Sequence, residues 1–319
     1  MRESLLKVEN VKLSYSSEYG SVRAVDGVSF DIAEKEVIGL IGESGCGKSS
    51  VALAIMGLNP GARIEEGKIL FQGKDLLKLS KKEMQKIRGN SISMIFQDPM
   101  TYLNPVMRVG DQIIEILITQ DPSLKKEEAR ARTIETLTQV RLTEKVLDYY
   151  PFELSGGMLQ RIMIAMMLAP KPQMVIADEP TTALDVTIQL QILNLLNSLQ
   201  KSEGISLLLI THDLGIVAEI CDRVYMMYAG KIVENADVYT IYERPKHPYT
   251  AGLIGSVLTI DEYKEELPTL SGDVPDLTDL PSGCRFHPRC EYAKDICYKE
   301  EPPLIEIDPG HQVLCWLYK

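Results

Sequence analysis

Short apolar runs alternate with stretches of helical periodicity over most of the chain. Three of these runs, at residues 36–42, 174–178 and 206–211, are almost continuously hydrophobic and have the length of a β-strand. Unbroken hydrophobicity is typical of parallel strands that are covered on both faces. Residues 187–202, between the second and third runs, place apolar residues at helical spacing. This strand–helix–strand order predicts an α/β domain.

Two segments depart from this alternation. Residues 111–147 have helical patterns and no strand-like run, so we expect a helical subdomain at about residues 100–170. After residue 237 the periodicity fades and prolines become frequent, as in "LPTLSGDVPDLTDLPSG". Such composition is typical of an extended appendage. We therefore expect a first domain at residues 1–237 and a C-terminal extension at residues 238–319.

The composition narrows the class of protein. The chain has 319 residues, of which 45% are hydrophobic and 25% charged, as in ordinary globular proteins. No apolar run reaches the roughly 18–20 residues of a membrane-spanning helix, and the N-terminal residues lack the apolar core of a signal peptide. We therefore expect a cytosolic chain that reaches a membrane only through a partner. The formal net charge of −11 argues against a nucleic-acid ligand, because nucleic-acid-binding proteins usually carry a basic footprint.

A phosphate-binding loop follows the first apolar run. Residues 42–50 read "GESGCGKSS", which matches G-x-x-x-x-G-K-[ST] between a strand and a helix. Backbone N–H groups of such a loop and the N-terminus of the next helix attract phosphate oxygens. We expect Lys48 to reach the β- and γ-phosphates and the Ser49 hydroxyl to bind Mg²⁺. Within the loop, the residues expected around the nucleotide are Gly42, Ser44, Gly45, Cys46, Gly47, Lys48, Ser49 and Ser50.

Two adjacent carboxylates end the second apolar run, in "MVIADEP". Asp178 stands at the end of the expected strand and is a candidate Mg²⁺ ligand. Glu179 is the candidate general base that polarises the attacking water. Acids after a strand are often only exposed loop residues, but the phosphate loop upstream favours the catalytic interpretation.

The segment "LSGGMLQR" at residues 154–161 resembles the signature motif of ATP-binding cassette (ABC) ATPases. Three further segments match that family in order: "IFQDP" with Gln97, "TTALD" with Asp185, and "ITHD" with His212. The resemblance implies a P-loop NTPase of ABC type. Such a fold has a parallel core sheet, an antiparallel β subdomain and a helical subdomain, here followed by a small irregular metal-binding extension.

The resemblance also implies roles for individual residues. Gln97 would sense Mg²⁺ and the attacking water, His212 would contact the γ-phosphate, and Asp185 would contact a partner subunit. Tyr15 is the expected adenine-stacking residue, with Tyr19 as the alternative. A second anion site, facing the phosphate loop of another subunit, would be formed by Ser155, Gly156 and Gly157.

Further likenesses point to one group of transporters. The segments "MIFQDPMTYLNPVMRVGDQI" and "ERPKHPYTAGLI" and the cysteine-rich tail resemble ATPases of dipeptide and oligopeptide permeases. The resemblance implies peptide import, driven by ATP-dependent dimer closure at the cytoplasmic face of the membrane. The implied partners are a second ABC ATPase subunit, identical or different, two integral membrane permease subunits, and an extracellular or periplasmic peptide-binding protein.

Three alternatives stay open from the sequence. Permeases for nickel and other small solutes share the same architecture. Soluble ABC proteins of DNA repair or translation usually carry two cassettes or a long coiled coil, and this chain shows one cassette and no sustained heptads. A cassette that only regulates and does not hydrolyse is disfavoured because the catalytic motifs are intact.

The tail places four cysteines at C-x₅-C-x₆-C-x₁₇-C spacing: Cys284, Cys290, Cys297 and Cys315. Disulfides are disfavoured in a reducing cytosol, and the C-x₂₋₄-C knuckle of structural zinc sites is absent. Four thiolates at longer intervals can hold a [4Fe–4S] cluster, and the family resemblance points the same way. Zinc and free thiols or disulfides remain the alternatives. A cluster would stabilise the extension, which we expect to contribute little to ATP hydrolysis.

Overall fold

The computed structural model describes residues 4–17, 20–182, 184–256 and 270–319. The chain divides into two compact units. The first unit comprises residues 1–33, 37–77 and 211–319, and the second comprises residues 34–36 and 78–210. The C-terminal extension therefore shares a unit with the phosphate loop.

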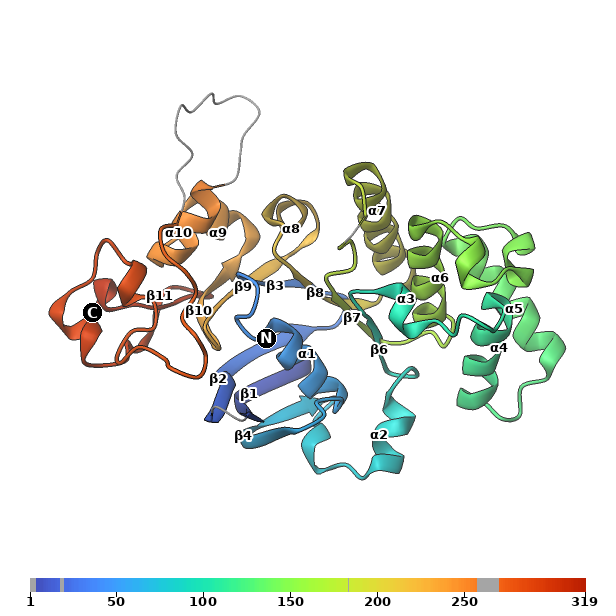
Figure 1. Ribbon diagram of the computed structural model, residues 1–319, viewed down its shortest axis with the longest axis horizontal. Helices are drawn as coiled ribbons and strands as arrows, with labels where there is room; N and C mark the ends of the chain where they lie inside the picture. The colour runs from blue at the N-terminus through green and yellow to red at the C-terminus, as the bar shows by residue number, and fades with distance from the viewer. Residues whose placement is uncertain (1–3, 18–19, 183, 257–269) are drawn as a thin grey trace. The chain divides into compact units, whose positions relative to one another are not determined.

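An antiparallel sheet forms one part of the first unit, with strand order β2-β1-β4-β5 (Figure 1). Its apolar residues alternate with polar ones, and Leu6, Leu13 and Val25 are fully buried. This alternation is typical of an antiparallel sheet with one face on a core. Its strands are β1 (Ser4–Ser17), β2 (Gly20–Ala33), β4 (Ala62–Phe71) and β5 (Lys74–Asp75).

A second set of strands in the first unit follows the order β11-β12-β10-β9-β3. Only the β3–β9 pair is parallel; the others are antiparallel. The last two strands of the chain thus extend this sheet, because Glu234 and Asn235 of β10 pair with Val313 and Gln312 of β12. The strands are β3 (Val37–Ile41), β9 (Arg223–Tyr228), β10 (Lys231–Asp237), β11 (Leu304–Asp308) and β12 (His311–Leu314).

The helices of the first unit begin at side-chain caps or at glycine. Asp213 accepts a hydrogen bond from the first turn of α8, at 3.3 Å, and Asp237 does the same for α9, at 3.0 Å. The helix α1 begins after Gly47 and ends at Gly57, and both glycines have positive φ. The helices are α1 (Lys48–Met56), α8 (Leu214–Ile220), α9 (Val238–Glu243) and α10 (Pro248–Gly255), with 3-10 turns η4 (His287–Arg289), η5 (Asp295–Tyr298) and η6 (Trp316–Tyr318) near the C-terminus.

Three parallel strands and a long helix form one part of the second unit. Strand β7 (Met174–Asp178) pairs in parallel with β6 (Ile92–Ile95) and with β8 (Ser206–Thr211), and every residue of these strands is buried. Helix α7 (Val186–Glu203) connects β7 to β8; Asp185 caps its start. The predicted strands at 174–178 and 206–211 and the helix between them are confirmed.

The rest of the second unit is helical, as the sequence predicted for residues 111–147 (Figure 1). Its interior is made of aliphatic side chains such as Ile113, Leu137 and Ile162, all fully buried. The short turn η1 (Leu76–Lys78) begins in the first unit and ends at the first residue of this stretch of the second. The other elements are α2 (Lys81–Ile87), α3 (Pro99–Tyr102), α4 (Val109–Gln120), α5 (Lys126–Gln139), η2 (Glu144–Asp148), η3 (Pro151–Glu153) and α6 (Gly156–Leu168).

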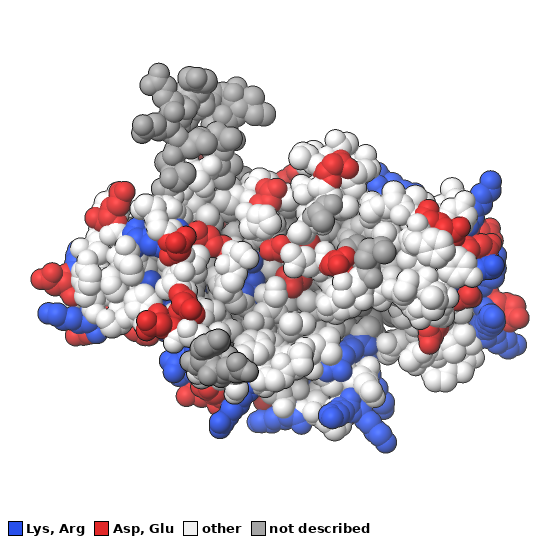
Figure 2. Space-filling model, in the orientation of Figure 1, with Lys and Arg blue, Asp and Glu red and all other residues white. Residues whose placement is uncertain are grey.

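Acidic and basic side chains stand next to one another on the outside of this helical part (Figure 2). Exposed pairs join Arg130 to Glu144 and Arg132 to Glu128, each at 3.0 Å. Pairs of this kind contribute little to stability because water screens them. Across the residues that the structure describes, no helix is both long and apolar enough to cross a membrane.

Candidate functional site

The phosphate loop is held tightly between strand β3 and helix α1. A Cβ on Gly42 would lie 2.1 Å from the carbonyl oxygen of Met227, and one on Gly47 would lie 2.2 Å from that of Ala24. Gly47 also has a φ of 108°, which favours glycine. The loop conformation therefore depends on glycine at these two positions, as the motif predicted.

Lys48 lies over the loop and is only 5% exposed. Its Nζ donates to the carbonyl oxygens of Gly42, at 2.7 Å, and Glu43, at 2.9 Å. The hydroxyl-bearing Ser44 and Ser49 are exposed. The loop thus presents a cation and two hydroxyl residues on a glycine-shaped backbone, which is an arrangement suited to a phosphate chain.

Two other residues expected near the nucleotide have defined surroundings. Burial raises the pKa of the Cys46 thiol, although Lys48 opposes the shift, so the thiol stays protonated at neutral pH. Tyr15 is half-buried, and its hydroxyl donates to Ser50 Oγ at 3.3 Å and accepts from Asn59 at 2.9 Å. Its expected stacking on adenine stays a prediction, and the alternative, Tyr19, lies outside the described residues.

The carboxylate of Glu179 is the centre of a small polar cluster in the second unit. Gln97 Nε2 donates to Glu179 Oε2 at 3.1 Å, and Thr182 Oγ1 donates to the same oxygen at 2.9 Å. Glu179 has a φ of 44°, a conformation that non-glycine residues rarely adopt and that is often found at functional sites. The structure therefore brings together two residues with predicted catalytic roles, Gln97 and Glu179. Sequence analysis missed Thr182, although it lies within the quoted "TTALD".

The other predicted residues occupy the ends of strands and helices. Asp178 is buried at the end of β7. Ser155 is exposed and caps α6, because its Oγ accepts from Met158 N–H at 3.4 Å. Gly156 and Gly157 form the first turn of that helix. His212 is exposed directly after β8.

The four tail cysteines lie near one another as free thiols. Burial, together with Cys297, Cys315 and Cys290, raises the pKa of Cys284 to about 11. The local backbone is shaped by hydrogen bonds such as Cys284 N–H to the Cys297 carbonyl oxygen, at 2.8 Å. Within the described parts of the chain, no group of three or more His, Cys, Asp or Glu side chains is placed to hold a metal ion. The expected metal-binding extension is therefore not supported by the residues that this structure describes.

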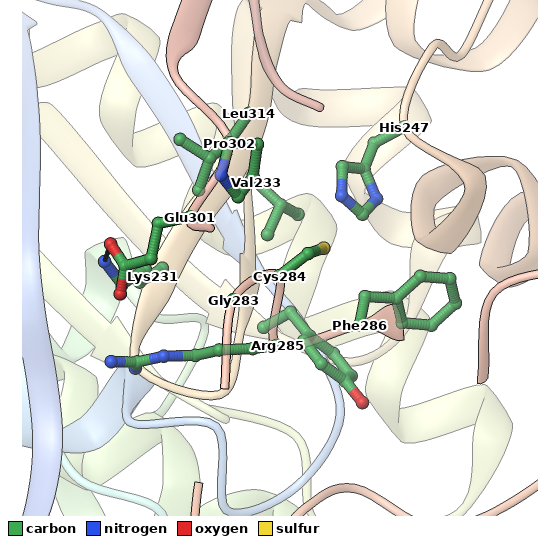
Figure 3. A pocket seen from close by; sticks show the side chains of 11 residues that line it. Lys231, Val233, His247, Gly283, Cys284, Arg285, Phe286, Glu301, Pro302 and Leu314 are labelled. Atoms are coloured by element: carbon green, nitrogen blue, oxygen red, sulfur yellow. Dashed lines mark hydrogen bonds and ion pairs between the residues drawn. The ribbon is translucent and has the colours of Figure 1, made fainter. Parts of the chain in front are cut away.

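An aromatic cluster joins the extension to the rest of the first unit. Ring centroids of Tyr228 and Tyr249 are 4.7 Å apart, and those of Tyr228 and Phe286 are 5.2 Å apart. The ring centroids of His247 and Phe286 are 5.6 Å apart. Burial lowers the pKa of His247 to about 3, so the imidazole is neutral. Figure 3 shows a pocket beside this cluster, with Cys284 among its lining residues and the Arg285 guanidinium extending away from Phe286.

Two protein-family models match this chain, one in the cassette and one toward the C-terminus. A family model described as "ABC transporter" matches residues 25–182. A second, described as "Oligopeptide/dipeptide transporter, C-terminal region", matches residues 233–297. This second match covers the aromatic cluster's His247 and Tyr249.

Curated relatives match over nearly their full length. The oligopeptide transport ATP-binding protein AppD of Bacillus subtilis is 48% identical over 320 residues, covering 99% of this chain and 97% of the relative. The dipeptide transport ATP-binding protein DppD of Bacillus subtilis is 48% identical, with coverages of 99% and 95%. The DppD protein of Escherichia coli is 46% identical, with coverages of 98% and 96%.

Solved structures confirm the cassette fold. The ATP-binding cassette MJ0796, in a dimeric post-hydrolysis state with ADP and Pi, matches with a TM-score of 0.67 and 29% identity, over 73% of this chain and 98% of that one. CbiO1 of Clostridium perfringens matches with a TM-score of 0.66 and 30% identity, over 76% and 93%. The chain therefore belongs to the ABC transporter family and carries the C-terminal region found in its oligopeptide/dipeptide transporters.

Proposed function

We propose that this chain is the ATP-hydrolysing subunit that powers import of dipeptides or oligopeptides across the cell membrane. The observation that carries the proposal is near full-length identity of 46–48% to peptide transport ATP-binding proteins. The site geometry supports hydrolysis, because Gln97 and Thr182 both donate to the carboxylate of Glu179. A hydrogen-bonded carboxylate with a fixed position can orient and polarise a water molecule.

Each candidate residue has a proposed part in the reaction. The loop backbone and Lys48 bind the phosphates of ATP. Ser49, Gln97 and Asp178 are the proposed Mg²⁺ ligands, since Mg²⁺ is usually held by a few protein oxygens together with substrate phosphates. Mg²⁺, when bound, neutralises negative charge on the phosphates. Glu179 accepts the proton of the attacking water, with Gln97 and His212 orienting the reactants.

We further propose that the working form contains two ATPase subunits. Ser155, Gly156 and Gly157 at the start of α6 would bind the ATP held by the partner, because an exposed helix N-terminus favours phosphate. Two integral membrane permease subunits and a peptide-binding protein complete the proposed assembly, which places this chain at the cytoplasmic face of the membrane. ATP binding closes the dimer and hydrolysis reopens it.

The decisive variant is Glu179→Gln. It keeps the size and hydrogen-bonding shape of the side chain but cannot accept a proton, so ATP turnover should disappear while ATP-dependent dimerisation remains. Lys48→Ala is the matched control, since it should weaken nucleotide binding itself. Full ATPase activity in Glu179→Gln would refute the assignment of the base.

The substrate is tested on the assembled transporter. Purification with the membrane subunits, followed by ATPase assays in vesicles, should show stimulation by peptides in the presence of the binding protein. Stimulation by nickel and not by peptides would favour the alternative group of permeases.

We also propose a [4Fe–4S] cluster at Cys284, Cys290, Cys297 and Cys315, with zinc as the alternative. The family resemblance of the tail supports the proposal, and all four cysteines are free to act as ligands. Anaerobically purified protein should then be brown, absorb near 400 nm, and contain iron and sulfide in equal amounts. A colourless protein with one zinc ion per chain would establish the alternative, and a metal-free folded protein would refute both.

A further inference from the structure

Glu43, the second residue of the phosphate loop, is bound by an arginine of the cysteine-rich tail. Arg289 Nη1 donates to Glu43 Oε2 at 2.7 Å, and Arg289 Nη2 donates to Glu43 Oε1 at 3.0 Å. The two contacts form a parallel fork, which is the strong geometry for an arginine–carboxylate pair. The Arg289 side chain is 4% exposed and that of Glu43 is 27% exposed, so the pair is partly shielded from water.

Arg289 is fixed in place by its own surroundings. Its Nε donates to the carbonyl oxygen of Ser271 at 3.0 Å. Its guanidinium lies 5.7 Å from the ring centroid of Tyr228 and 5.9 Å from that of Phe286. These contacts hold the guanidinium in place independently of the carboxylate, so the side chain loses little further freedom when the pair forms.

A second residue of the C-terminal region binds the backbone of Glu43. The Tyr249 hydroxyl accepts a hydrogen bond from Glu43 N–H at 2.9 Å. Tyr249 is completely buried. Its helix α10 is anchored because the buried carboxylate of Glu234 accepts from the N–H groups of Lys246, at 2.7 Å, and His247, at 2.8 Å.

Glu43 therefore connects the C-terminal region to the phosphate-binding lysine. Its N–H and carboxylate bind Tyr249 and Arg289, and its carbonyl oxygen accepts from Lys48 Nζ at 2.9 Å. An unpaired carboxylate at this position would place a negative charge beside the loop that must receive phosphates. The carboxylate would also compete with phosphate for the Lys48 ammonium.

We infer that Arg289 and Tyr249 are positioning residues for ATP binding. Arg289 neutralises Glu43, and Tyr249 fixes the backbone of the loop. The inference rests on the proposed ATPase function, and it departs from the sequence-based expectation that the extension contributes little to ATP hydrolysis. The C-terminal region thus sets the affinity of the cassette for ATP.

The test is a double-mutant cycle between Arg289→Ala and Glu43→Gln, with KM and kcat for MgATP hydrolysis and direct MgATP binding as readouts. Arg289→Ala should raise KM about tenfold, equivalent to about 1.4 kcal/mol, with a smaller effect on kcat. Adding Glu43→Gln should restore most of the affinity, because no charge is left to neutralise. If Arg289 had a purely structural role, adding Glu43→Gln would not restore the affinity for MgATP.

Arg285 provides a matched control from the same segment. It is buried as well, but it pairs with Asp26 and with the carbonyl oxygen of Ala229 and not with the loop carboxylate. Glu43→Gln should therefore fail to rescue Arg285→Ala. Equal rescue of both arginine variants, or no rescue of Arg289→Ala, would overturn the inference.

Two further outcomes separate the possible failures. If Arg289→Ala does not fold, Arg289→Met serves in its place, because it keeps much of the length of the side chain and removes the charge. An unchanged KM in that variant would overturn the inference. A wild-type chain that neither binds nor hydrolyses ATP refutes the proposed function. An active wild type whose KM is not moved by Arg289→Ala refutes only the inference.

Discussion

The contact between Tyr249 and the phosphate loop can be tested by removing a single oxygen atom. Tyr249→Phe keeps the ring, which packs 4.7 Å from Tyr228 and 5.6 Å from Phe286, so no cavity is created. It leaves the N–H of Glu43 without its acceptor. An unsatisfied buried donor costs about 1–3 kcal/mol. Because Glu43 is only half-buried, water satisfies part of this demand, and we expect a loss of about 1 kcal/mol in the free energy of unfolding.

The neighbouring residue supplies the control. Thr250 is completely buried in the same helix, and its Oγ1 has no hydrogen-bond partner among the residues that the structure describes. Thr250→Val removes this hydroxyl at nearly constant volume and helix propensity. We therefore expect the variant to be as stable as the wild type or slightly more stable, because an unpaired polar group leaves the interior.

The assay can use a built-in probe. Trp316 is the single tryptophan of the chain and is buried in the first unit, so its fluorescence reports urea unfolding of that unit. Tyr249→Phe should lower the urea midpoint, and Thr250→Val should not. If Thr250→Val lost as much stability as Tyr249→Phe, the argument from individual hydrogen bonds would be wrong.

Three further predictions concern the loop, a buried charge pair and pH. Gly47→Ala should abolish ATP binding in a titration, because its Cβ would lie 2.2 Å from a carbonyl oxygen. A Cβ on Gly45 has no atom within 4 Å, so Gly45→Ala should bind ATP better than Gly47→Ala does. Arg285→Ala should lower the urea-derived free energy of unfolding by at least about 2 kcal/mol, because Asp26 loses a buried partner. The double variant Arg285→Met with Asp26→Asn should recover much of the lost stability. If it recovered none, the loss could not be ascribed to the unpaired charge of Asp26. Asp237 caps α9, and a hydrogen bond from a hydroxyl in its first turn lowers its pKa below the ordinary 3.8. Its stabilisation is therefore complete at neutral pH and lost as the pH falls through the lowered pKa. Asp237→Ala should cost about 0.5–1 kcal/mol at pH 7, and urea unfolding should show a smaller cost as the pH falls below the ordinary pKa.

Much of the nucleotide site followed from the sequence because its parts are local. The run "GESGCGKSS" contains the glycines, the lysine and the hydroxyls within nine consecutive residues, so the chain must form the loop wherever a strand and a helix flank it. The apolar strand before Asp178 likewise predicted where that carboxylate lies, because a strand and its end are defined by adjacent residues. The sequence by itself therefore determined the class of chemistry and predicted the residues that would carry it.

Other features depended on the tertiary structure. Arg289 and Glu43 are separated by 246 positions, and Tyr249 and Glu43 by 206, so no local pattern could pair them. The pairing exists because the C-terminal region packs against the phosphate loop in one unit. The cysteine spacing, in contrast, suggested a metal site that the folded arrangement of the thiols does not support. Residue type and spacing determine what a side chain can do, but only the packing of distant segments decides which group it meets.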